Sequence, residues 1–392
     1  MKKKIKVAVV INNRANYARI KSFLLNSKKY KNLQLDLILA ASSVVEKFGE
    51  LESIIKKDGL KISKKLFTII EGDRPITMAK TTAIEISELS NVFENNRPDY
   101  VFAIADRFET LSVAVAASYM NIPLLHLQGG EVTGSIDESV RHAISKFANI
   151  HFPATTNSKN NLIKMGENPK TIFNVGCPSI DLAKTIEKKK RTLKSILNNY
   201  KFSMQDKISL SNIKDYIIVV QHPVTTEYTE TKKQIKTTID AISKLNIQTI
   251  WLWPNVDSGS DIISKELRIA REKGYLEKTL FIKNLSADDF LILLNNSKCI
   301  VGNSSVGIRE SSYLGVPSIN IGKRQNGREK AENVVQVKHH VGDILSAIKY
   351  QLKKKKYKKS YLYGDGKSGK KITNIILKLN IKNTQKRLFY GS

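Results

Sequence analysis

The stretch YVFAIADRFETLSVAVAASYMNIPLLHL, residues 100–127, decides the fold class. It begins with a short apolar run, Tyr100–Ala105, continues with a helical pattern, Thr110–Tyr119, and ends with a second apolar run, Pro123–Leu127. Short apolar runs separated by one helix are typical of a βαβ unit, in which a crossover helix joins two parallel strands. The stretch therefore predicts a parallel sheet, with the polar residues that follow Ile104 at the carboxyl end of a strand.

The same alternation extends outward through both halves of the chain. In the first half we expect strands at Ile5–Ile11, Leu33–Ala40, Tyr100–Ala105, Pro123–Leu127, Ile150–Pro153 and Ile172–Val175, and helices at Tyr17–Leu25, Ile76–Asn95, Thr110–Tyr119, Ser139–Phe147 and Ser158–Met165. In the second half we expect strands at Tyr216–Gln221, Thr249–Trp253, Leu280–Ile282, Cys299–Val301 and Pro317–Ile321, and helices at Thr229–Lys244, Ser260–Lys273, Ala287–Leu294 and Gly307–Leu314.

A chain of 392 residues exceeds what one hydrophobic core usually supports. The alternation stops in a Lys-, Asn- and Ser-rich stretch between about 188 and 212. We therefore predict an α/β protein with two Rossmann-like doubly wound domains, an N-terminal one at residues 1–184 and a C-terminal one at 185–392. The architecture leaves open whether the basic C-terminal tail packs back on the first domain. Two such domains are expected to face a ligand cleft with the carboxyl ends of their strands.

The net charge of +29 raises the possibility of nucleic-acid binding. Only 13 of the 65 basic residues are arginine, however, whereas contacts to bases and phosphates favour arginine. A general bias toward lysine explains most of the charge, so we expect no nucleic-acid partner. No apolar run is long enough to span a bilayer. The two cysteines, Cys177 and Cys299, are too few for a disulfide scaffold, which fits a cytoplasmic location.

Polar clusters follow three strands of the first half. Asn12–Tyr17 lacks the glycines of a dinucleotide fingerprint, so bound NAD is disfavoured, but Arg14 near a helix start suits a phosphate. Asp106 and Arg107 follow the strand that begins at Tyr100, where an N-cap with its ion pair is the structural alternative. The third cluster is the densest and combines carboxylates, histidines and an arginine suited to proton transfer. Its candidate residues are His126, Gln128, Glu131, Asp137, Arg141 and His142.

Polar clusters also follow strands of the second half. His222 precedes a proline that holds it extended, although a structural histidine is an open alternative. Asn255 lies in a polar turn that could contact a sugar. Ser304 and Ser305 open a helix after Gly302-Asn303 and could cradle a pyrophosphate. Glu310, one turn later, could accept from ribose hydroxyls, and Arg324 follows the last strand. No zinc-ligand spacing, Walker motif or nucleophile elbow is present.

Taken in order, these clusters resemble the hydrolysing UDP-N-acetylglucosamine 2-epimerases, over about residues 6–334. The resemblance is carried by Asn13-Arg14-Ala15-Asn16-Tyr17, Asp106-Arg107-Phe108, Gly129-Gly130-Glu131-Val132-Thr133-Gly134, Asp137 with Arg141-His142-Ala143-Ile144, Gln221 to Thr226, Gly302-Asn303-Ser304-Ser305 and Arg324-Gln325-Asn326-Gly327-Arg328. The chain departs from the usual family pattern at Asn16, Ala18, Ala105 and Gln128, where the family commonly has aspartate, serine or glycine, glycine, and histidine or glutamate.

The resemblance implies a fold of the glycosyltransferase-B type and an enzyme that converts UDP-N-acetylglucosamine and water to N-acetylmannosamine and UDP, for sialic acid or related nonulosonate synthesis. It implies no metal and no cofactor, and a homodimer or homotetramer. By position, Arg14, Arg107, Ser304, Ser305, Glu310 and Arg324 would bind UDP. Asp106, Glu131, Asp137, Arg141 and His222 would surround the sugar. Either Asp106 or Glu131 would move the proton at C2, and the sequence does not choose between them.

Three alternatives remain at this stage. The nearest is a hydrolysing 2-epimerase of UDP-2,4-diacetamido-trideoxyhexose in the legionaminic acid pathway, which the same resemblance covers. A glycosyltransferase of the same fold would transfer the sugar to an acceptor and could dock on a membrane through the Lys353–Lys359 region. A nucleic-acid-binding protein would show steeply salt-dependent retention of strands.

Overall fold

The computed structural model describes residues 4–45, 51–72, 75–187, 189, 191–200, 202–203, 213, 215–254, 259–283, 285–381, 384–386 and 388–389. The chain divides into two compact units. Unit 1 comprises Met1–Val132, Ile136–Leu182 and Tyr363–Ser392, and unit 2 comprises Thr133–Ser135 and Ala183–Leu362. The expected boundary between residues 184 and 185 lies close to Ala183, where the long segment of unit 2 begins. Residues from Tyr363 onward return to unit 1.

Unit 1 is built on a six-stranded parallel sheet with the order β3-β2-β1-β4-β5-β6. The strands are β1 (Ile5–Ile11), β2 (Leu33–Leu39), β3 (Ile62–Lys65), β4 (Tyr100–Ile104), β5 (Leu124–Leu127) and β6 (Ile150–Phe152). This is the Rossmann order, in which the direction of winding reverses between β1 and β4. Ligands of such sheets bind beside that switch point, at the carboxyl ends of the strands.

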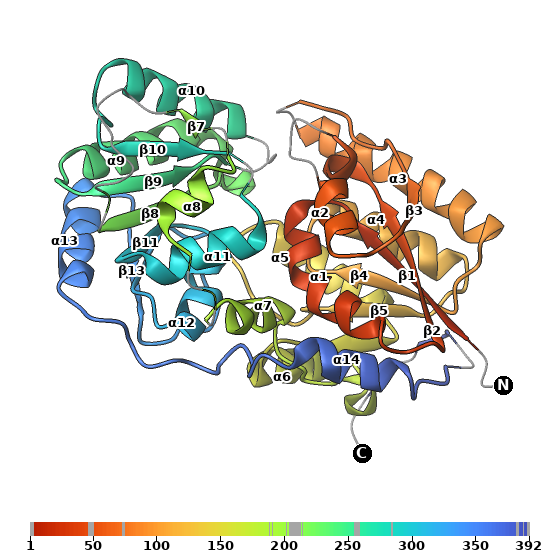
Figure 1. Cartoon of the computed structure of the whole chain (residues 1–392). Coiled ribbons are helices and arrows are strands. Elements are labelled where there is room, and N and C mark those ends of the chain that lie inside the picture. The colour runs from red at the N-terminus through yellow and green to blue at the C-terminus, as the bar shows by residue number, and fades with distance from the viewer. Residues whose placement is uncertain are drawn as a thin grey trace. The chain divides into compact units, whose positions relative to one another are not determined.

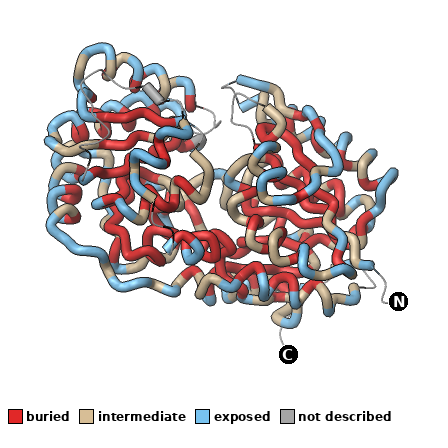
Figure 2. Tube along the Cα trace, viewed as in Figure 1, coloured by how far each residue is buried: buried red, intermediate tan, exposed pale blue. Residues whose placement is uncertain are grey.

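Helices cover both faces of this sheet (Figure 1). One face packs against α1 (Arg14–Ser27), α2 (Leu51–Lys57) and α14 (Ser368–Ile376), and the other against α3 (Pro75–Asn95), α4 (Phe108–Tyr119) and α5 (Asp137–Phe147). The remaining elements of this unit are η1 (Ala41–Val44), α6 (Thr156–Lys164), η3 (Pro169–Thr171) and the start of α7 (Pro178–Ile186). The central strands are therefore buried from both sides, as Figure 2 shows, which is why their sequences are mostly apolar.

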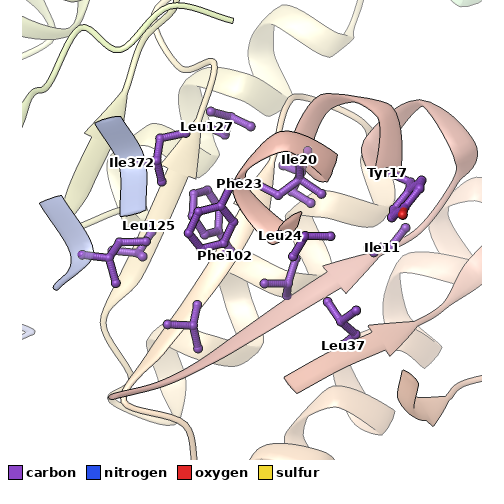
Figure 3. Packing of buried hydrophobic residues seen from close by; sticks show 14 of the residues in the cluster. Ile11, Tyr17, Ile20, Phe23, Leu24, Leu37, Phe102, Leu125, Leu127 and Ile372 are labelled. Carbon is purple, nitrogen blue, oxygen red and sulfur yellow. The ribbon is translucent and has the colours of Figure 1, made fainter. Parts of the chain in front are cut away.

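The core on the α1 face contains a row of aromatic rings. The Phe102 ring centroid lies 5.3 Å from that of Phe23 and 5.8 Å from that of Phe152. Figure 3 shows Ile372 of α14 among the same cluster, and Ile372 is fully buried. At the start of α14, the Asp181 carboxylate accepts hydrogen bonds from the backbone N–H groups of Ser368 and Gly369, at 2.9 and 2.8 Å. The C-terminal helix is thus an integral part of the core of unit 1.

Unit 2 repeats the same topology. Its seven-stranded sheet has the order β13-β12-β11-β8-β9-β10-β7, in which the first six strands are parallel and β7 is antiparallel at the edge. The strands are β7 (Phe202–Ser203), β8 (Tyr216–Val220), β9 (Gln248–Leu252), β10 (Thr279–Ile282), β11 (Cys299–Gly302), β12 (Ser318–Ile321) and β13 (Val334–Val337). The winding reverses between β8 and β11, so the ligand edge is expected there.

The helical elements of unit 2 are α8 (Leu193–Leu197), η5 (Thr225–Glu230), α9 (Thr231–Ser243), α10 (Ser260–Glu272), α11 (Ala287–Asn296), η6 (Ser305–Gly307), α12 (Glu310–Leu314) and α13 (Val341–Leu352). Trp251 is buried at the centre of this core, and its ring centroid lies 6.4 Å from that of Phe281. Among the described residues, no helix has both the length and the apolar character needed to cross a bilayer.

The predicted α/β class with two doubly wound domains is confirmed, and several local predictions differ from the structure. The elements α2, α7, β7, α13 and α14 were not predicted. The expected strand at Ile172–Val175 is a single bridge between Ile172 and His151. The edge strand β3 was missed because three of its four residues are exposed and two are lysines. The strand β13 was also missed, since its exposed edge position leaves it only partly buried.

Candidate functional site

At the switch point of unit 1, one asparagine side chain joins the ends of β1 and β4. Asn16 Oδ1 accepts a hydrogen bond from the Asn12 N–H at 3.3 Å, and its Nδ2 donates to the Ile104 carbonyl at 3.2 Å. Asn13 caps the helix that follows, because its side chain accepts from the Asn16 N–H at 2.9 Å. Arg14 is the first residue of this 14-residue helix. The N-terminus of α1 and Arg14 together present positive charge at the ligand edge of the sheet.

Asp106 lies at the end of β4, between two arginines. Its carboxylate contacts the Arg141 guanidinium, and its second oxygen lies 3.7 Å from Arg19 Nη1. Arg141 is almost fully buried and also donates to the Glu131 carbonyl at 2.7 Å. Burial alone would lower the pKa of Arg141, but the neighbouring carboxylates of Asp106, Glu131 and Asp137 raise it. A permanently charged guanidinium therefore gathers three carboxylates around itself.

This cluster brings together four of the residues that the sequence singled out: Asp106, Glu131, Asp137 and Arg141. Asp137 is the first residue of α5 and lies one helical turn before Arg141. Arg19 was not among the predicted residues. It follows Asn16 by three positions, so it lies on the same face of α1, and that spacing was the available signal.

Arg107 is held in place by its neighbour Glu109. Its Nε and Nη2 donate to the two Glu109 carboxylate oxygens at 3.1 and 3.2 Å, and Glu109 is almost fully buried. The guanidinium also lies over the Phe108 ring, 5.4 Å from its centroid. This arrangement fixes the direction of the Arg107 side chain.

His126 and Gln128 lie inside unit 1, away from the position that the sequence suggested. Both side chains are buried. The His126 ring contacts Ala105 O and Ser145 Oγ, at 2.9 and 3.1 Å, and Gln128 Nε2 donates to Cys177 Sγ at 2.8 Å. Their polar atoms are thus engaged within the protein, so we leave both residues out of the proposed ligand site. His142 is partly exposed, with its Nε2 3.6 Å from Glu138 Oε1 on the same helix.

At the switch point of unit 2, Asn303 has the role that Asn16 has in unit 1. Its Oδ1 accepts from the His222 N–H and its Nδ2 donates to the His222 carbonyl, both at 2.8 Å. The end of β8 is thus fixed to the loop that follows β11. Gly302 precedes this loop with φ of 134°, and a Cβ atom there would lie 2.0 Å from the Val220 carbonyl oxygen. Only glycine permits this close approach of the two strands.

Ser304, Ser305 and Glu310 follow in the same loop and the helix after it. Ser304 precedes the short 3₁₀ helix η6, which begins at Ser305. Glu310 is buried at the start of α12, and its Oε2 has no hydrogen-bond partner among the described residues. A buried carboxylate oxygen without a partner is costly unless a ligand donor meets it, so Glu310 is a candidate acceptor for a hydroxyl group.

The loop after β12 contributes a cation, Arg324, to the ligand edge of unit 2. Arg324 Nη1 donates to the Asn303 carbonyl at 3.3 Å, and Gln325 Nε2 donates to the same oxygen at 2.9 Å. Gln325 in turn accepts from Arg328 Nη1 at 2.7 Å. In the sequence, Gln325 and Arg328 stood out only as members of the motif at residues 324–328. Their role here is to hold the Arg324 loop against the Ser304 loop.

Two predicted features need a brief statement. Asn255 lies outside the described residues. Among the residues that the structure describes, no group of three or more His, Cys, Asp or Glu side chains is arranged to hold a metal ion. Each unit therefore has its own set of candidate groups at the ligand edge of its sheet.

Comparison with known proteins identifies the family. The profile described as UDP-N-acetylglucosamine 2-epimerase matches residues 26–377, most of the chain. The chain belongs to the UDP-N-acetylglucosamine 2-epimerase family.

Two similar relatives, both named as hydrolysing 2-epimerases, are about one third identical to this chain over nearly their whole length. The UDP-N,N'-diacetylbacillosamine 2-epimerase (hydrolyzing) of Legionella pneumophila is 34% identical over 374 residues, which cover 95% of each chain. The GDP/UDP-N,N'-diacetylbacillosamine 2-epimerase (hydrolyzing) of Campylobacter jejuni is 33% identical over 359 residues, 91% of this chain and 90% of the relative.

The crystal structure of the UDP-GlcNAc 2-epimerase of Neisseria meningitidis, bound to UDP-GlcNAc, has the same fold. The TM-score is 0.77 at 19% identity, and the match covers 96% of this chain and 100% of the other. The glycosyltransferase-B type of fold expected for a 2-epimerase of this family is therefore confirmed.

Proposed function

We propose that this chain cleaves a UDP-2,4-diacetamido-trideoxyhexose with water, inverts the configuration at C2 of the sugar, and releases UDP. Family membership makes the chain a UDP-sugar 2-epimerase. The observation that carries the choice of sugar is the agreement of the two relatives above, at 34% and 33% identity, both of which are named for diacetylbacillosamine, a 2,4-diacetamido sugar.

This proposal replaces the substrate that the sequence first suggested. UDP-N-acetylglucosamine was the main expectation and the diacetamido sugar the alternative. The relatives favour the alternative. UDP-N-acetylglucosamine remains the competing substrate, because the family takes its name from it.

The proposed reaction has two steps, and its atoms balance. A carboxylate removes the proton from C2 while the C1–O bond to UDP breaks, which leaves a C1=C2 double bond and free UDP. Water then adds its oxygen to C1, and a proton returns to C2 on the opposite face. C2 is not adjacent to a carbonyl, so direct enolisation cannot exchange its proton, and loss of UDP is needed to make the step possible.

We assign the proton transfers to the Arg141 cluster. Asp106 and Glu131 are the candidates for the carboxylate that acts at C2, and Asp137 supports them. The contact with Arg141 favours the ionised form of Asp106, which suits a base. The partial burial of the cluster strengthens these charge interactions by limiting access of water.

We assign UDP binding to the edge of unit 2 that contains Asn303. Ser304 and Ser305 would donate to the pyrophosphate, Arg324 would balance its charge, and Glu310 would accept from the ribose through its unpartnered Oε2. Arg14, Arg107 and His222 complete the proposed set of phosphate-contacting groups. The assignment of the unit 2 groups is supported by the anchoring of the His222 and Arg324 loops on Asn303.

The test is incubation of the purified chain with UDP-N,N'-diacetylbacillosamine and, separately, with UDP-N-acetylglucosamine in D₂O, without any acceptor. We expect free UDP and a free 2-epimeric sugar with deuterium at C2, formed with a higher kcat/KM from the diacetamido substrate. A higher kcat/KM for UDP-N-acetylglucosamine would contradict the choice of sugar. An epimerised sugar that stays attached to UDP, or turnover only with an acceptor, would contradict the hydrolytic reaction.

A further inference from the structure

Ala105, the residue before Asp106, has a backbone conformation that a residue with a side chain rarely adopts. Its φ is 66°, in the left-handed region. Both polar groups of this residue are fixed by β5: its N–H donates to the Leu127 carbonyl at 3.0 Å, and its carbonyl accepts from His126 Nε2 at 2.9 Å. A conformation of this kind persists only where the surroundings enforce it, and such positions gather at functional sites.

The contacts of His126 determine which of its ring nitrogens carries hydrogen. The Ala105 carbonyl can only accept, so Nε2 must be the donor. Burial lowers the pKa of His126 to about 3, so the ring is neutral and Nδ1 has a free lone pair. Ser145 Oγ, 3.1 Å away, therefore donates to Nδ1. The ring acts as a rigid link between the Ser145 hydroxyl and the Ala105 peptide.

Gly129 provides the space that this link requires. A Cβ atom at Gly129 would lie 2.8 Å from Ser145 Oγ and 2.9 Å from His126 Nδ1. Any side chain at this position would separate the two partners. The φ of Gly129 is not in the left-handed region, so the need for glycine here comes from packing against the His126 and Ser145 pair.

Ser145 connects the link to the rest of α5 and to the end of the chain. It lies one helical turn after Arg141, whose guanidinium contacts Asp106 directly. The Lys386 ammonium donates to the carbonyls of Ser145 and Lys146, both at 3.0 Å, which are among the last of α5. A cation at this end of a helix satisfies free carbonyls and is favoured by the helix dipole.

We propose that His126 is a positioning residue for Asp106, held by Ser145 and, behind it, by Lys386 of the C-terminal segment. α5 then fixes Asp106 twice: Arg141 holds its carboxylate, and the Ser145 and His126 pair holds the peptide on its amino side. The proposal rests on the proposed role of Asp106 in the reaction. It predicts that a buried histidine influences kcat without touching the substrate.

The central test combines His126→Leu with Ala105→Gly. The leucine variant removes the donor to the Ala105 carbonyl, so the strained peptide loses its restraint. We expect kcat to fall about tenfold or more, because small misplacement of a reacting group is costly, while the Kd for UDP stays within about twofold. Glycine adopts the left-handed conformation without strain. Adding Ala105→Gly to His126→Leu is therefore expected to restore most of the lost kcat.

A matched control and two further variants separate positioning from general destabilisation. Leu125→Ala removes a buried side chain next to His126 in β5 and is expected to lower thermal stability while leaving kcat nearly unchanged. His126→Gln, which can keep a donor near the position of Nε2, is expected to retain more kcat than His126→Leu. Gly129→Ala leaves the His126 side chain unchanged but places a methyl group against both His126 Nδ1 and Ser145 Oγ. This variant is expected to lower kcat. These two variants keep the proposal testable should His126→Leu fold poorly.

The outcomes are distinguishable. Wild-type turnover is measured first, with both sugar nucleotides. Its absence would overturn the proposed function and this inference together. With an active wild type, an unchanged kcat in His126→Leu and in Gly129→Ala would overturn the inference alone. A loss of kcat that follows the loss of folded protein and is not restored by Ala105→Gly would also overturn it. A fall in kcat at constant UDP affinity, restored by glycine, supports it.

Discussion

Asp106 is held by arginines on two different helices, which favour its ionised form and fix the orientation of its carboxylate. Substitution Asp106→Asn keeps the shape but removes the charge and a proton acceptor. We expect kcat to fall by about a hundredfold or more, the usual effect of losing a general base. The measurement is UDP release at saturating substrate. Asp99→Asn is the control, since Asp99 accepts from the Lys6 N–H at 2.8 Å, before the start of β4.

The control variant is expected to change kcat by less than about twofold, because Asp99 lies before the start of β4 and has no assigned role in the reaction. Near-normal turnover of Asp106→Asn would instead show that Asp106 does not move the proton, and Glu131 would become the remaining candidate.

The strain at Ala105 gives a second expectation for a single residue. Because φ is 66°, glycine removes the steric penalty of the left-handed conformation. We expect Ala105→Gly to raise the free energy of unfolding of unit 1 by up to about 1 kcal/mol. Ala103→Gly, in the middle of β4, should lower it by about the same amount, since glycine weakens a strand. Urea unfolding followed by circular dichroism compares them. Equal effects of the two substitutions would refute the strain.

Residue spacing predicted much of the carboxylate cluster, but it did not predict which way side chains point. Asp106, Glu131, Asp137 and Arg141 were found because they follow strands or share a helical face. His126 belongs to a strand with both faces covered, where side chains alternate between two buried layers. Nothing in a single sequence states that β5 is buried on both sides along its whole length, so a histidine next to a polar loop was taken for a ligand contact.

At the scale of elements, each sheet is joined at its switch point by one asparagine. Asn16 connects β1 to β4, and Asn303 connects β8 to the loop after β11. Where the two central strands end at the switch point, the backbone groups need hydrogen-bond partners outside the sheet. Side-chain amides supply these partners. The strand and helix alternation was predictable from periodicity, whereas this use of an amide depends on partners distant in sequence.

The contacts of Glu167 near the end of α5 predict that the stability of the fold depends on pH. Burial alone would raise the pKa of Glu167, but hydrogen bonds from His151, Lys146 and Lys386 lower it to about 2. The folded pKa is therefore below the ordinary value of 4.5, so Glu167 stabilises the fold above that value and loses its effect as the pH falls toward 2. We expect Glu167→Gln to lower Tm at pH 7, and the difference from wild type to shrink between pH 4.5 and pH 3.

Thermal unfolding at a series of pH values, followed by circular dichroism, measures this difference. Glu138→Gln is the control on α5, because Glu138 is partly exposed and its Oε1 lies 3.6 Å from His142 Nε2. A Tm difference for Glu167→Gln that stays constant across this pH range would contradict the assigned ionisation.

At the scale of the whole molecule, two domains were predictable from length and from the break in alternation near residue 188. The sequence did not decide where the end of the chain belongs. Residues 368–376 carry an apolar stripe between lysines, but the abundance of lysine in the tail led to the expectation of a solvated surface instead of a buried helix. The position of this helix depends on Asp181, which accepts from the start of α14, and on the Ser22 backbone, which leaves room only for glycine at position 369.

This arrangement predicts a large effect of Ile372→Ala on unit 1. Ile372 is fully buried among Phe23 and Phe102, so its truncation leaves a cavity. We expect a loss of about 2–4 kcal/mol in the free energy of unfolding of unit 1. Both tryptophans, Trp251 and Trp253, lie in unit 2, so their fluorescence follows that unit alone, whereas circular dichroism follows both.

The expected result is a transition that shifts to lower urea in circular dichroism, with a smaller shift in tryptophan fluorescence. Ile375→Ala, on the same helix but only partly buried, is the control and is expected to cost less. A fluorescence transition that shifts more than the circular dichroism transition would contradict the assignment of α14 to unit 1.

The return of the chain to unit 1 also has a consequence for biosynthesis. A ribosome that makes this protein releases every residue of unit 2 before it releases Ile372 and Ile376, which the earlier unit needs for its core. The half that is synthesised first is therefore the last to become complete, against the usual order in which nascent domains mature. Until residues 368–376 leave the ribosome, the cluster around Phe23 lacks the cover that α14 provides. We expect chaperones to bind the apolar surface that stays exposed during this time.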